Sequence, residues 1–251
     1  MIINILGNTT WGITLAKVLS NDKNQVNLVF IDEKKLLMLS NEPSIKVDRF
    51  EIPRSKNINY IFIEEMNLNK EDTLIIAVPS PRLIDNLNLI KNKVNNTTQF
   101  ISASKGFDKD GNTLSVLIKN KLKIPEENIG VLSGPNLSSE ILMNKPATSL
   151  LSFKDIKKAN YFRDNISNEI FRIYSGSDVI GSEIGGSLKN IIAIGCGIID
   201  KMQLGDNAKS AFISRGLREI VRFGTSFKAK EYTFYGPVSY THLTLPTTPY
   251  V

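Results

Sequence analysis

The first 32 residues of the chain follow a pattern that few folds accommodate. Two apolar stretches, Met1–Leu6 and Val26–Ile31, are separated by a glycine-containing turn and a helical pattern over residues 13–19, and the second stretch ends at Asp32. Strand, glycine turn, helix, strand and acidic residue is the order of a dinucleotide-binding βαβ unit. In such a unit the helix N-terminus binds the pyrophosphate and the acidic residue pairs with ribose hydroxyls.

The turn of this unit departs from the usual glycine pattern. Gly7 and Gly12 are in place, but Thr9 stands where a middle glycine would let the backbone approach the pyrophosphate. From these residues alone, a structural βα turn without a ligand is as good an interpretation as a cofactor site.

Strand and helix patterns continue to alternate as far as residue 151. The further predicted strands cover residues 73–78, 99–102, 129–132 and 147–151, and the helices between them cover residues 83–94, 114–122 and 137–143. This alternation predicts an α/β fold of the Rossmann type, with a parallel, right-handed, doubly wound sheet. Ligands of such sheets lie outside the C-terminal strand ends, where we expect the loops 79–81, 104–106 and 133–136. Lys105 would place a positive charge there, although a lysine before a glycine is also ordinary turn chemistry.

After Tyr174 the pattern becomes almost wholly helical. We therefore predict a dinucleotide-binding domain over residues 1–175 and an incomplete all-α domain over residues 176–236. Within the second domain, Asp206 is a good N-cap for a helix with apolar residues at helical spacing.

The helical part contains an apolar run, Ile191–Ile194, surrounded by five glycines: Gly181, Gly185, Gly186, Gly195 and Gly197. Because a glycine inside a helix costs about 1 kcal/mol relative to alanine, five of them suggest close approach of another helix, a backbone or a ligand. Lys189 precedes this run, and partial desolvation there would lower its pKa and suit it to proton transfer. The spacing alone favours tight helix packing with a solvated lysine.

Composition narrows the function classes. The formal net charge of +6 is scattered, without a basic run interleaved with aromatic residues, so we expect no nucleic-acid surface. The single cysteine, Cys196, permits no internal disulfide and sits among isoleucines, which predicts a buried thiol in a reduced, cytoplasmic protein. No apolar run approaches membrane-spanning length and no basic segment opens the chain, so we expect no membrane insertion. We predict no metal site.

Residues 237–251 differ in composition from the lysine-rich helices before them. The segment is rich in threonine and proline and has no charged residue apart from His242 when that side chain is protonated. It shows neither a helical stripe nor strand alternation, which is typical of a disordered terminus or of sequence foreign to the protein. We favour the foreign origin.

A set of short motifs follows in order between Ile3 and Gly236. They are Gly7-x-x-x-Trp11-Gly12, Val78-Pro79-Ser80, Ser104-Lys105-Gly106, Ser133-Gly134-Pro135, Gly181-x-Glu183-x-Gly185-Gly186-x-Leu188-Lys189-Asn190, Gly205-Asp206-Asn207-Ala208-Lys209, Arg215-Gly216 and Thr233-Phe234-Tyr235-Gly236. In this order the chain resembles the NAD(P)-dependent glycerol-3-phosphate dehydrogenases of the soluble bacterial type. Each motif alone is weak, whereas the ordered set is highly specific.

This resemblance implies a reaction and a set of residue roles. Lys189 would be the general acid/base that protonates the carbonyl oxygen of dihydroxyacetone phosphate as hydride arrives, which gives sn-glycerol 3-phosphate for phospholipid synthesis. The implied substrate contacts are Lys105, Gly134, Asn136 and Asn190. The implied contacts to NAD or NADP are Gly7, Thr10, Trp11, Gly12, Asp32, Pro79, Lys105 and Ser138. A carboxylate at Asp32 favours NAD, although Lys34 and Lys35 could serve a 2′-phosphate.

The end of the chain departs from the family pattern. His242 falls where the family has a substrate-binding aspartate, and the arginine that clamps the substrate phosphate has no counterpart. We therefore predict a C-terminally truncated dehydrogenase with a tail outside the family from Pro237, and a homodimer for the full-length protein. Two alternatives stay open: a related two-domain hydroxyacid dehydrogenase, and a catalytically dead NAD-binding fragment.

Overall fold

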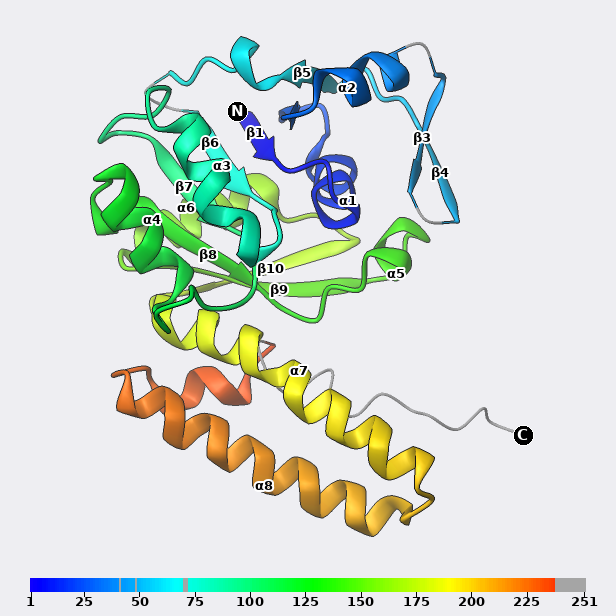
Figure 1. Cartoon of the computed structure of the whole chain (residues 1–251), viewed down its shortest axis with the longest axis vertical. Helices are drawn as coiled ribbons and strands as arrows, with labels where there is room; N and C mark the ends of the chain where they lie inside the picture. Colours follow the sequence, from blue (N-terminus) through cyan, green and yellow to red (C-terminus); the bar gives the residue numbers. More distant parts are fainter. Residues whose placement is uncertain (41, 48, 70–71, 238–251) are drawn as a thin grey trace.

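An eight-stranded sheet runs through the upper part of the molecule in Figure 1, in the computed structural model that describes residues 1–40, 42–47, 49–69 and 72–237. The strand order is β10-β9-β8-β7-β6-β1-β2-β5. Its members are β1 (Ile2–Leu6), β2 (Gln25–Phe30), β5 (Ile58–Phe62), β6 (Thr73–Ile76), β7 (Gln99–Ser102), β8 (Ile129–Ser133), β9 (Ala147–Phe153) and β10 (Phe171–Gly176). Strands β2 and β5 extend the sheet on one side of β1, and β6 begins the extension on the other side. The change of direction between β1 and β6 creates the switch point where such sheets bind ligands.

The expectation of a parallel sheet holds for the six strands from β8 to β5, and one pairing corrects it. Strand β9 runs antiparallel to β8, with Leu132 opposite Leu151, and β10 runs parallel to β9. The connection from β8 to β9 contains the five-residue helix α5 (Ser138–Leu142), which is too short to serve as the crossover helix that a parallel pairing requires.

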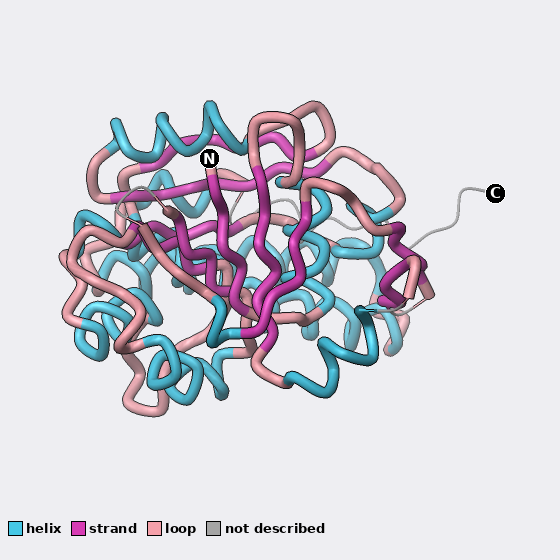
Figure 2. The backbone as a smooth tube through the Cα atoms, turned by 90° about the horizontal axis from the view of Figure 1, so that it is seen from above, coloured by secondary structure: helices cyan, strands magenta, loops and turns pink. Residues whose placement is uncertain are grey.

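Helices cover both faces of the sheet (Figure 2). In β1, Ile3 and Ile5 face the core with α1 (Thr10–Leu19) and α6 (Ile156–Ile166), whereas Leu6 faces the core with α3 (Leu83–Ile90) and α4 (Leu114–Leu122). This alternation follows from the two-residue period of a strand. The remaining elements of this part are α2 (Glu33–Ser40), the hairpin β3 (Ser44–Val47) and β4 (Phe50–Pro53), and the short 3-10 turns η1 (Ile63–Glu65), η2 (Ser80–Arg82) and η3 (Glu126–Asn128).

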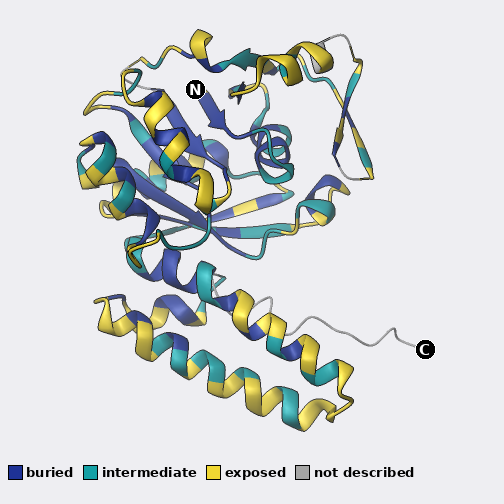
Figure 3. Cartoon of the chain, in the orientation of Figure 1, coloured by how far each residue is buried: buried dark blue, intermediate teal, exposed yellow. Residues whose placement is uncertain are grey.

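Two long antiparallel helices, α7 (Val179–Lys201) and α8 (Gly205–Ser226), lie below the sheet in Figure 1, followed by η4 (Glu231–Tyr235). The predicted domain boundary near Ser175 falls close to the end of β10, and it stays a prediction. Figure 3 shows that burial is concentrated in the first half of α7, which contacts the sheet domain, and that much of α8 is exposed. In the described residues no helix is both long and apolar enough to cross a membrane.

The glycines of α7 serve helix packing at some positions and not at others. A Cβ on Gly195 would lie 2.2 Å from the ring of Phe212 on α8, so this glycine permits the close contact of the two helices. Gly197 has no neighbouring atom within 4 Å, so our expectation of close approach is wrong there. Cys196 is buried in the core that α7 and α8 share, as predicted.

The predicted N-cap at Asp206 is also wrong. Helix α8 begins at Gly205 with Leu204 as its N-cap, and Asp206 lies in the first turn, where its charge still favours the helix N-terminus. A tight turn with positive φ at Gln203 and Gly205 brings the chain directly into the helix. His242 and the rest of residues 238–251 lie outside the described residues.

A row of asparagine amides crosses three parallel strands on one face of the sheet. Asn27 on β2 donates to Asn4 on β1 at 2.9 Å and accepts from Asn59 on β5 at 2.9 Å. The three residues are paired in register, and Asn4 is fully buried. The amides thus favour this register of the three strands, because a shift would leave buried polar groups without partners.

We expect Asn27→Ala to lower the free energy of unfolding by about 1–3 kcal/mol, because the buried carbonyl of Asn4 loses its donor. Asn59→Ala is the matched control, since Asn59 is exposed and water can replace its bond, so we expect a change within about 0.5 kcal/mol. Urea unfolding of both variants measures the difference. Equal losses in the two variants would contradict the role of the buried amide.

Candidate active site

Lys189 lies on the buried side of α7, where the helix passes the C-terminal end of β8. The residue is 2% exposed, and its Nζ donates a hydrogen bond to the carbonyl oxygen of Gly134 at 2.6 Å. Gly186 favours this approach, because a Cβ there would lie 2.2 Å from the hydroxyl of Ser133, which would have to turn away. The prediction of a solvated lysine, which spacing alone favoured, is therefore wrong, because the amine of Lys189 is desolvated.

Lys105 reaches the same carbonyl from the neighbouring strand end. It follows β7, and its Nζ lies 3.4 Å from the carbonyl oxygen of Gly134. Residues 84 positions apart in the sequence thus place two amines against one backbone oxygen. Three of the residues predicted for the site, Lys105, Gly134 and Lys189, are in direct contact.

Burial and the nearby amine of Lys105 both lower the pKa of Lys189. Desolvation of the ammonium group is the main cause, and the charge of Lys105 adds to it, so that the pKa of Lys189 falls from its ordinary 10.5 to about 7. Burial also lowers the pKa of Lys105. An amine that titrates near neutral pH can both hold and release a proton, which a surface lysine does not do.

Beside the amines lies a hollow of about 380 Å³ at the switch point of the sheet. Its walls come from the first turn of α1 and from the loops after β6, β7 and β8. Lining residues are Thr9, Thr10, Trp11, Ala77, Val78, Pro79, Ala103, Ser104, Lys105, Asn136 and Ser138. Five of the predicted cofactor residues and the predicted substrate residue Asn136 are therefore in one place.

The glycine turn before α1 has the form that a bound pyrophosphate requires. Gly7 has φ +122°, and a Cβ there would lie 2.6 Å from the carbonyl oxygen of Ala77. The backbone N–H groups of Thr10 and Trp11 belong to the first turn of α1, which has no intrahelical acceptors for them. These groups and the helix dipole suit the phosphates of a dinucleotide.

Thr9, the departure from the glycine pattern, has a structural role in this turn. Its hydroxyl accepts the N–H of Gly12 at 3.1 Å as the N-cap of α1 and donates to the carbonyl oxygen of Ala77 at 2.8 Å. The hydroxyl therefore ties the turn to the end of β6 and uses one N–H group that a ligand would otherwise meet.

Two predicted residues lie apart from the amines and the hollow. Asp32 follows β2, is exposed, and accepts the N–H of Lys35 at 3.2 Å, so it caps α2. Asn190 is exposed on α7, and within the described residues its side chain forms no hydrogen bond to Lys189. In the described ranges no three His, Cys, Asp or Glu side chains gather as a metal site would require.

Sequence reasoning assigned no role to two polar side chains of α7 that contact the Lys105 loop. Ser187 accepts the N–H of Gly106 at 2.9 Å, and Glu183 accepts the N–H of Ser115 at 2.8 Å. The available signal was a carboxylate inside a run of glycines and apolar residues, with a hydroxyl one turn later. Burial raises the pKa of Glu183 to about 7.

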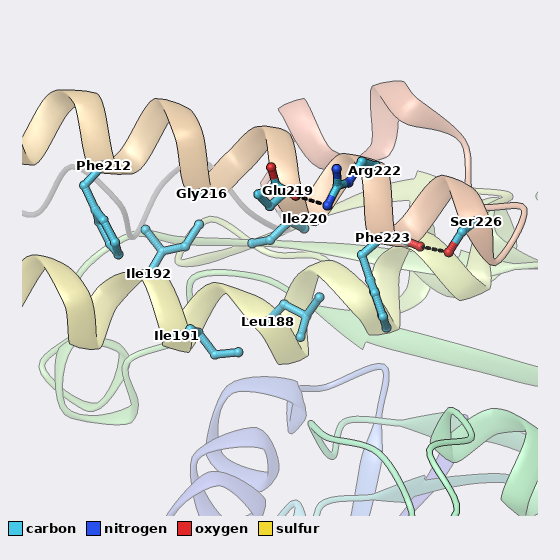
Figure 4. Close-up of a pocket in the computed structure, with 10 residues that line it drawn as sticks. All are labelled: Leu188, Ile191, Ile192, Phe212, Gly216, Glu219, Ile220, Arg222, Phe223 and Ser226. Carbon is cyan, nitrogen blue, oxygen red and sulfur yellow. Dashed lines mark hydrogen bonds and ion pairs between the residues drawn. The ribbon is translucent and has the colours of Figure 1, made fainter.

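A separate apolar groove of about 520 Å³ lies between α7 and α8 (Figure 4). Phe212 and Phe223 border it, and Glu219 and Arg222 form an ion pair of 2.7 Å at its edge. The amines of Lys105 and Lys189 do not line this groove. We therefore place no chemistry in it.

Two family models match the chain. Residues 2–159 match the model described as NAD-dependent glycerol-3-phosphate dehydrogenase N-terminus, and residues 178–248 match the corresponding C-terminus. The second match extends into the segment from Pro237, for which a foreign origin stays a prediction.

Known proteins with the same family name are similar over most of the chain. The glycerol-3-phosphate dehydrogenase [NAD(P)+] of Dehalococcoides mccartyi (strain CBDB1) is 36% identical over 238 residues, which cover 92% of this chain and 66% of the relative. The protein of that name from Oceanobacillus iheyensis is 33% identical, with 93% and 68% covered. A crystal structure of glycerol-3-phosphate dehydrogenase from Coxiella burnetii superposes with a TM-score of 0.85 at 28% identity, covering 99% of this chain and 76% of that one. The chain thus spans about two thirds of the length of the curated relatives.

We expect Lys189→Met to be more stable than the parent chain at neutral pH, with an advantage that shrinks as the pH rises. Because folding lowers the pKa of Lys189 from 10.5 to about 7, the unfolded chain binds a proton between these values that the folded chain does not. The parent's stability therefore rises with pH in this range, and the advantage of the variant falls by about 3 kcal/mol between pH 7 and pH 10. Urea unfolding of both proteins across this range measures it, and an advantage independent of pH would contradict a desolvated amine.

Proposed function

Since the chain belongs to the NAD-dependent glycerol-3-phosphate dehydrogenase family, we propose that it carries the cofactor site and the proton-transferring lysine of such an enzyme. The reaction is reversible hydride transfer between NAD(P)H and dihydroxyacetone phosphate, with sn-glycerol 3-phosphate as the reduced product. The observation that carries this proposal is the pair of amines, Lys105 and Lys189, on one carbonyl beside the hollow at the switch point.

The cofactor supplies the hydride when it is bound, and the side chains of this protein supply position and charge. Gly7 and Gly12 allow the tight turn before α1, because a Cβ on either would clash with a backbone oxygen, and the free N–H groups at this helix start would receive the pyrophosphate. Trp11, Pro79 and Ser138 line the hollow and would contact the cofactor. Two positive amines near the substrate ketone stabilise the negative charge that develops on its oxygen.

Lys189 provides the proton for that oxygen. Its Nζ, with a pKa near 7, gives up a proton to the ketone oxygen during reduction and takes it from the alcohol during oxidation. Gly134 holds this amine through its carbonyl, and Asn136, which lines the hollow, is a candidate to orient the substrate. Asn190, exposed on α7 next to Lys189, is a second candidate.

Asp32 supports a preference for NAD over NADP. The exposed carboxylate follows β2, where the ribose of a dinucleotide lies, and it would repel a 2′-phosphate. Lys34 and Lys35 begin α2 next to it and could weaken the preference.

Assembly as a homodimer and a cytoplasmic location complete the proposal. Exposed apolar side chains of α7 and α8 support the dimer, among them Ile191, Ile194 and Phe223. The single cysteine of the chain is consistent with a reducing compartment.

Lys189→Met is expected to lower the turnover of dihydroxyacetone phosphate with NADH about 10²–10⁴-fold, because the acid is lost. The Kd of NADH is expected to change less than about threefold, because Lys189 does not line the cofactor hollow. Steady-state oxidation of NADH and a fluorescence titration measure the two quantities. Lys201→Met, which removes an exposed lysine from the end of the same helix, is the control, and equal losses in the two variants would refute the assignment.

Asp32→Asn is expected to narrow the preference for NADH over NADPH by about fivefold, because one repulsive charge worth ~1 kcal/mol is removed from the ribose site. Titration of both cofactors against each variant gives the ratio of their Kd values. Asp22→Asn removes an exposed carboxylate near the opposite end of β2 and should leave that ratio unchanged. A ratio that is the same in all three proteins would count against Asp32 as the determinant.

A further inference from the structure

The loop that carries Lys105 is fastened on both sides of that residue. On one side, the hydroxyl of Ser104 donates to the carbonyl oxygen of Val78 at 2.6 Å and accepts its N–H at 3.2 Å. On the other side, the N–H of Gly106 donates to the hydroxyl of Ser187 on α7 at 2.9 Å. Lys105 is the single residue between these two attachments, so they fix the point from which its side chain starts.

The distances around the hydroxyl of Ser187 show which hydrogen bond it donates and which it accepts. Its hydroxyl lies 2.8 Å from the carbonyl oxygen of Glu183 and 3.4 Å from the carbonyl oxygen of Gly106. A hydroxyl has one proton, which goes to the nearer oxygen of Glu183, so its lone pairs remain available for the N–H of Gly106. Ser187 is therefore bonded to its own helix and to the loop at the same time.

One turn earlier on α7, Glu183 holds the far end of the same segment. Its two carboxylate oxygens accept the N–H of Ser115, at 2.8 Å, and the hydroxyl of Ser115. Ser115 is the second residue of α4, where a carboxylate satisfies a free N–H group of the helix start. Residues 106 and 115 are thus both attached to the helix that carries Lys189.

We propose that Ser187 is a positioning residue that holds the amine of Lys105 beside the amine of Lys189 by fastening Gly106 to α7. Lys189 follows Ser187 by two residues on the same helix, so the attachment links the two amines over a short, rigid path. Without it, the backbone next to Lys105 loses its hydrogen bond to α7 and the amine of Lys105 is held less firmly, while Phe107 still packs against Phe223 of α8.

This inference rests on the proposed function for its catalytic meaning, whereas the contact between the amines is measurable without turnover. Among the described residues, Lys105 is the charged side chain that acts on the pKa of Lys189. The titration midpoint of Lys189 therefore reports how near Lys105 is. NMR of the lysine ε-methylene groups gives this midpoint in the intact chain without substrate, and Lys189→Met and Lys105→Met identify the two signals.

Ser187→Ala is expected to raise the titration midpoint of Lys189 by about 0.5 to 1 pH unit, because a like charge moves away from it. Ser187→Thr, which keeps a hydroxyl able to bond the carbonyl of Glu183, is expected to restore the parent midpoint. Ser226→Ala removes a hydroxyl that bonds within α8 and serves as the matched control, with no expected change.

A double-mutant cycle separates positioning from a general loosening of α7. In a Lys105→Met background, Ser187→Ala should no longer move the midpoint of Lys189, because the charge through which it acts is gone. A shift that persists in that background, or an unchanged midpoint in Ser187→Ala itself, would overturn the proposal. Failure of the proposed function would be recognised in a different measurement, as undiminished turnover in Lys189→Met. Thermal unfolding of each variant shows that it is folded.

Discussion

One buried and one partly buried amine share one backbone oxygen, and much of this structure can be understood as what makes that arrangement possible. Like charges repel, and burial removes the water that would screen them, so Lys105 and Lys189 are together only because other contacts hold their backbones in place. The carbonyl of Gly134 compensates part of the cost. The rest appears as a lowered pKa of Lys189, so the energetic penalty of the arrangement is also the source of its chemistry.

The fold meets this constraint with rigid elements. Strands β7 and β8 deliver Lys105 and Gly134 to the same edge of the sheet, and α7 crosses that edge with a glycine at position 186, which leaves room for the hydroxyl of Ser133. The same edge carries the glycine turn of α1, so the hollow at the switch point and the amines are adjacent without any long loop to place them.

The sequence was sufficient for the βαβ order and the helical second part, because these depend on local periodicity, and for the family, because it depends on an ordered set of motifs. It was not sufficient for the antiparallel direction of β9, because that direction follows from α5 being too short to serve as the crossover to a parallel strand. It also missed Ser187, whose partner Gly106 is 81 positions away, since no local pattern records such a contact. Asp206 shows a further limit. A residue with good N-cap chemistry does not occupy the N-cap position when the preceding turn, with positive φ at Gln203 and Gly205, starts the helix before it.

The cap of α7 has a consequence for the order in which this chain takes shape. One oxygen of Asp178 accepts the N–H of Gly181 close by, whereas the other accepts the N–H of Lys230 and the hydroxyl of Thr233, more than fifty residues later. During synthesis on the ribosome, that second oxygen meets these two partners only after residues 230–233 have left the exit tunnel. The half that contains the sheet can therefore assemble first, and the helix that carries Lys189 is locked in place only after residues 230–233 have been made.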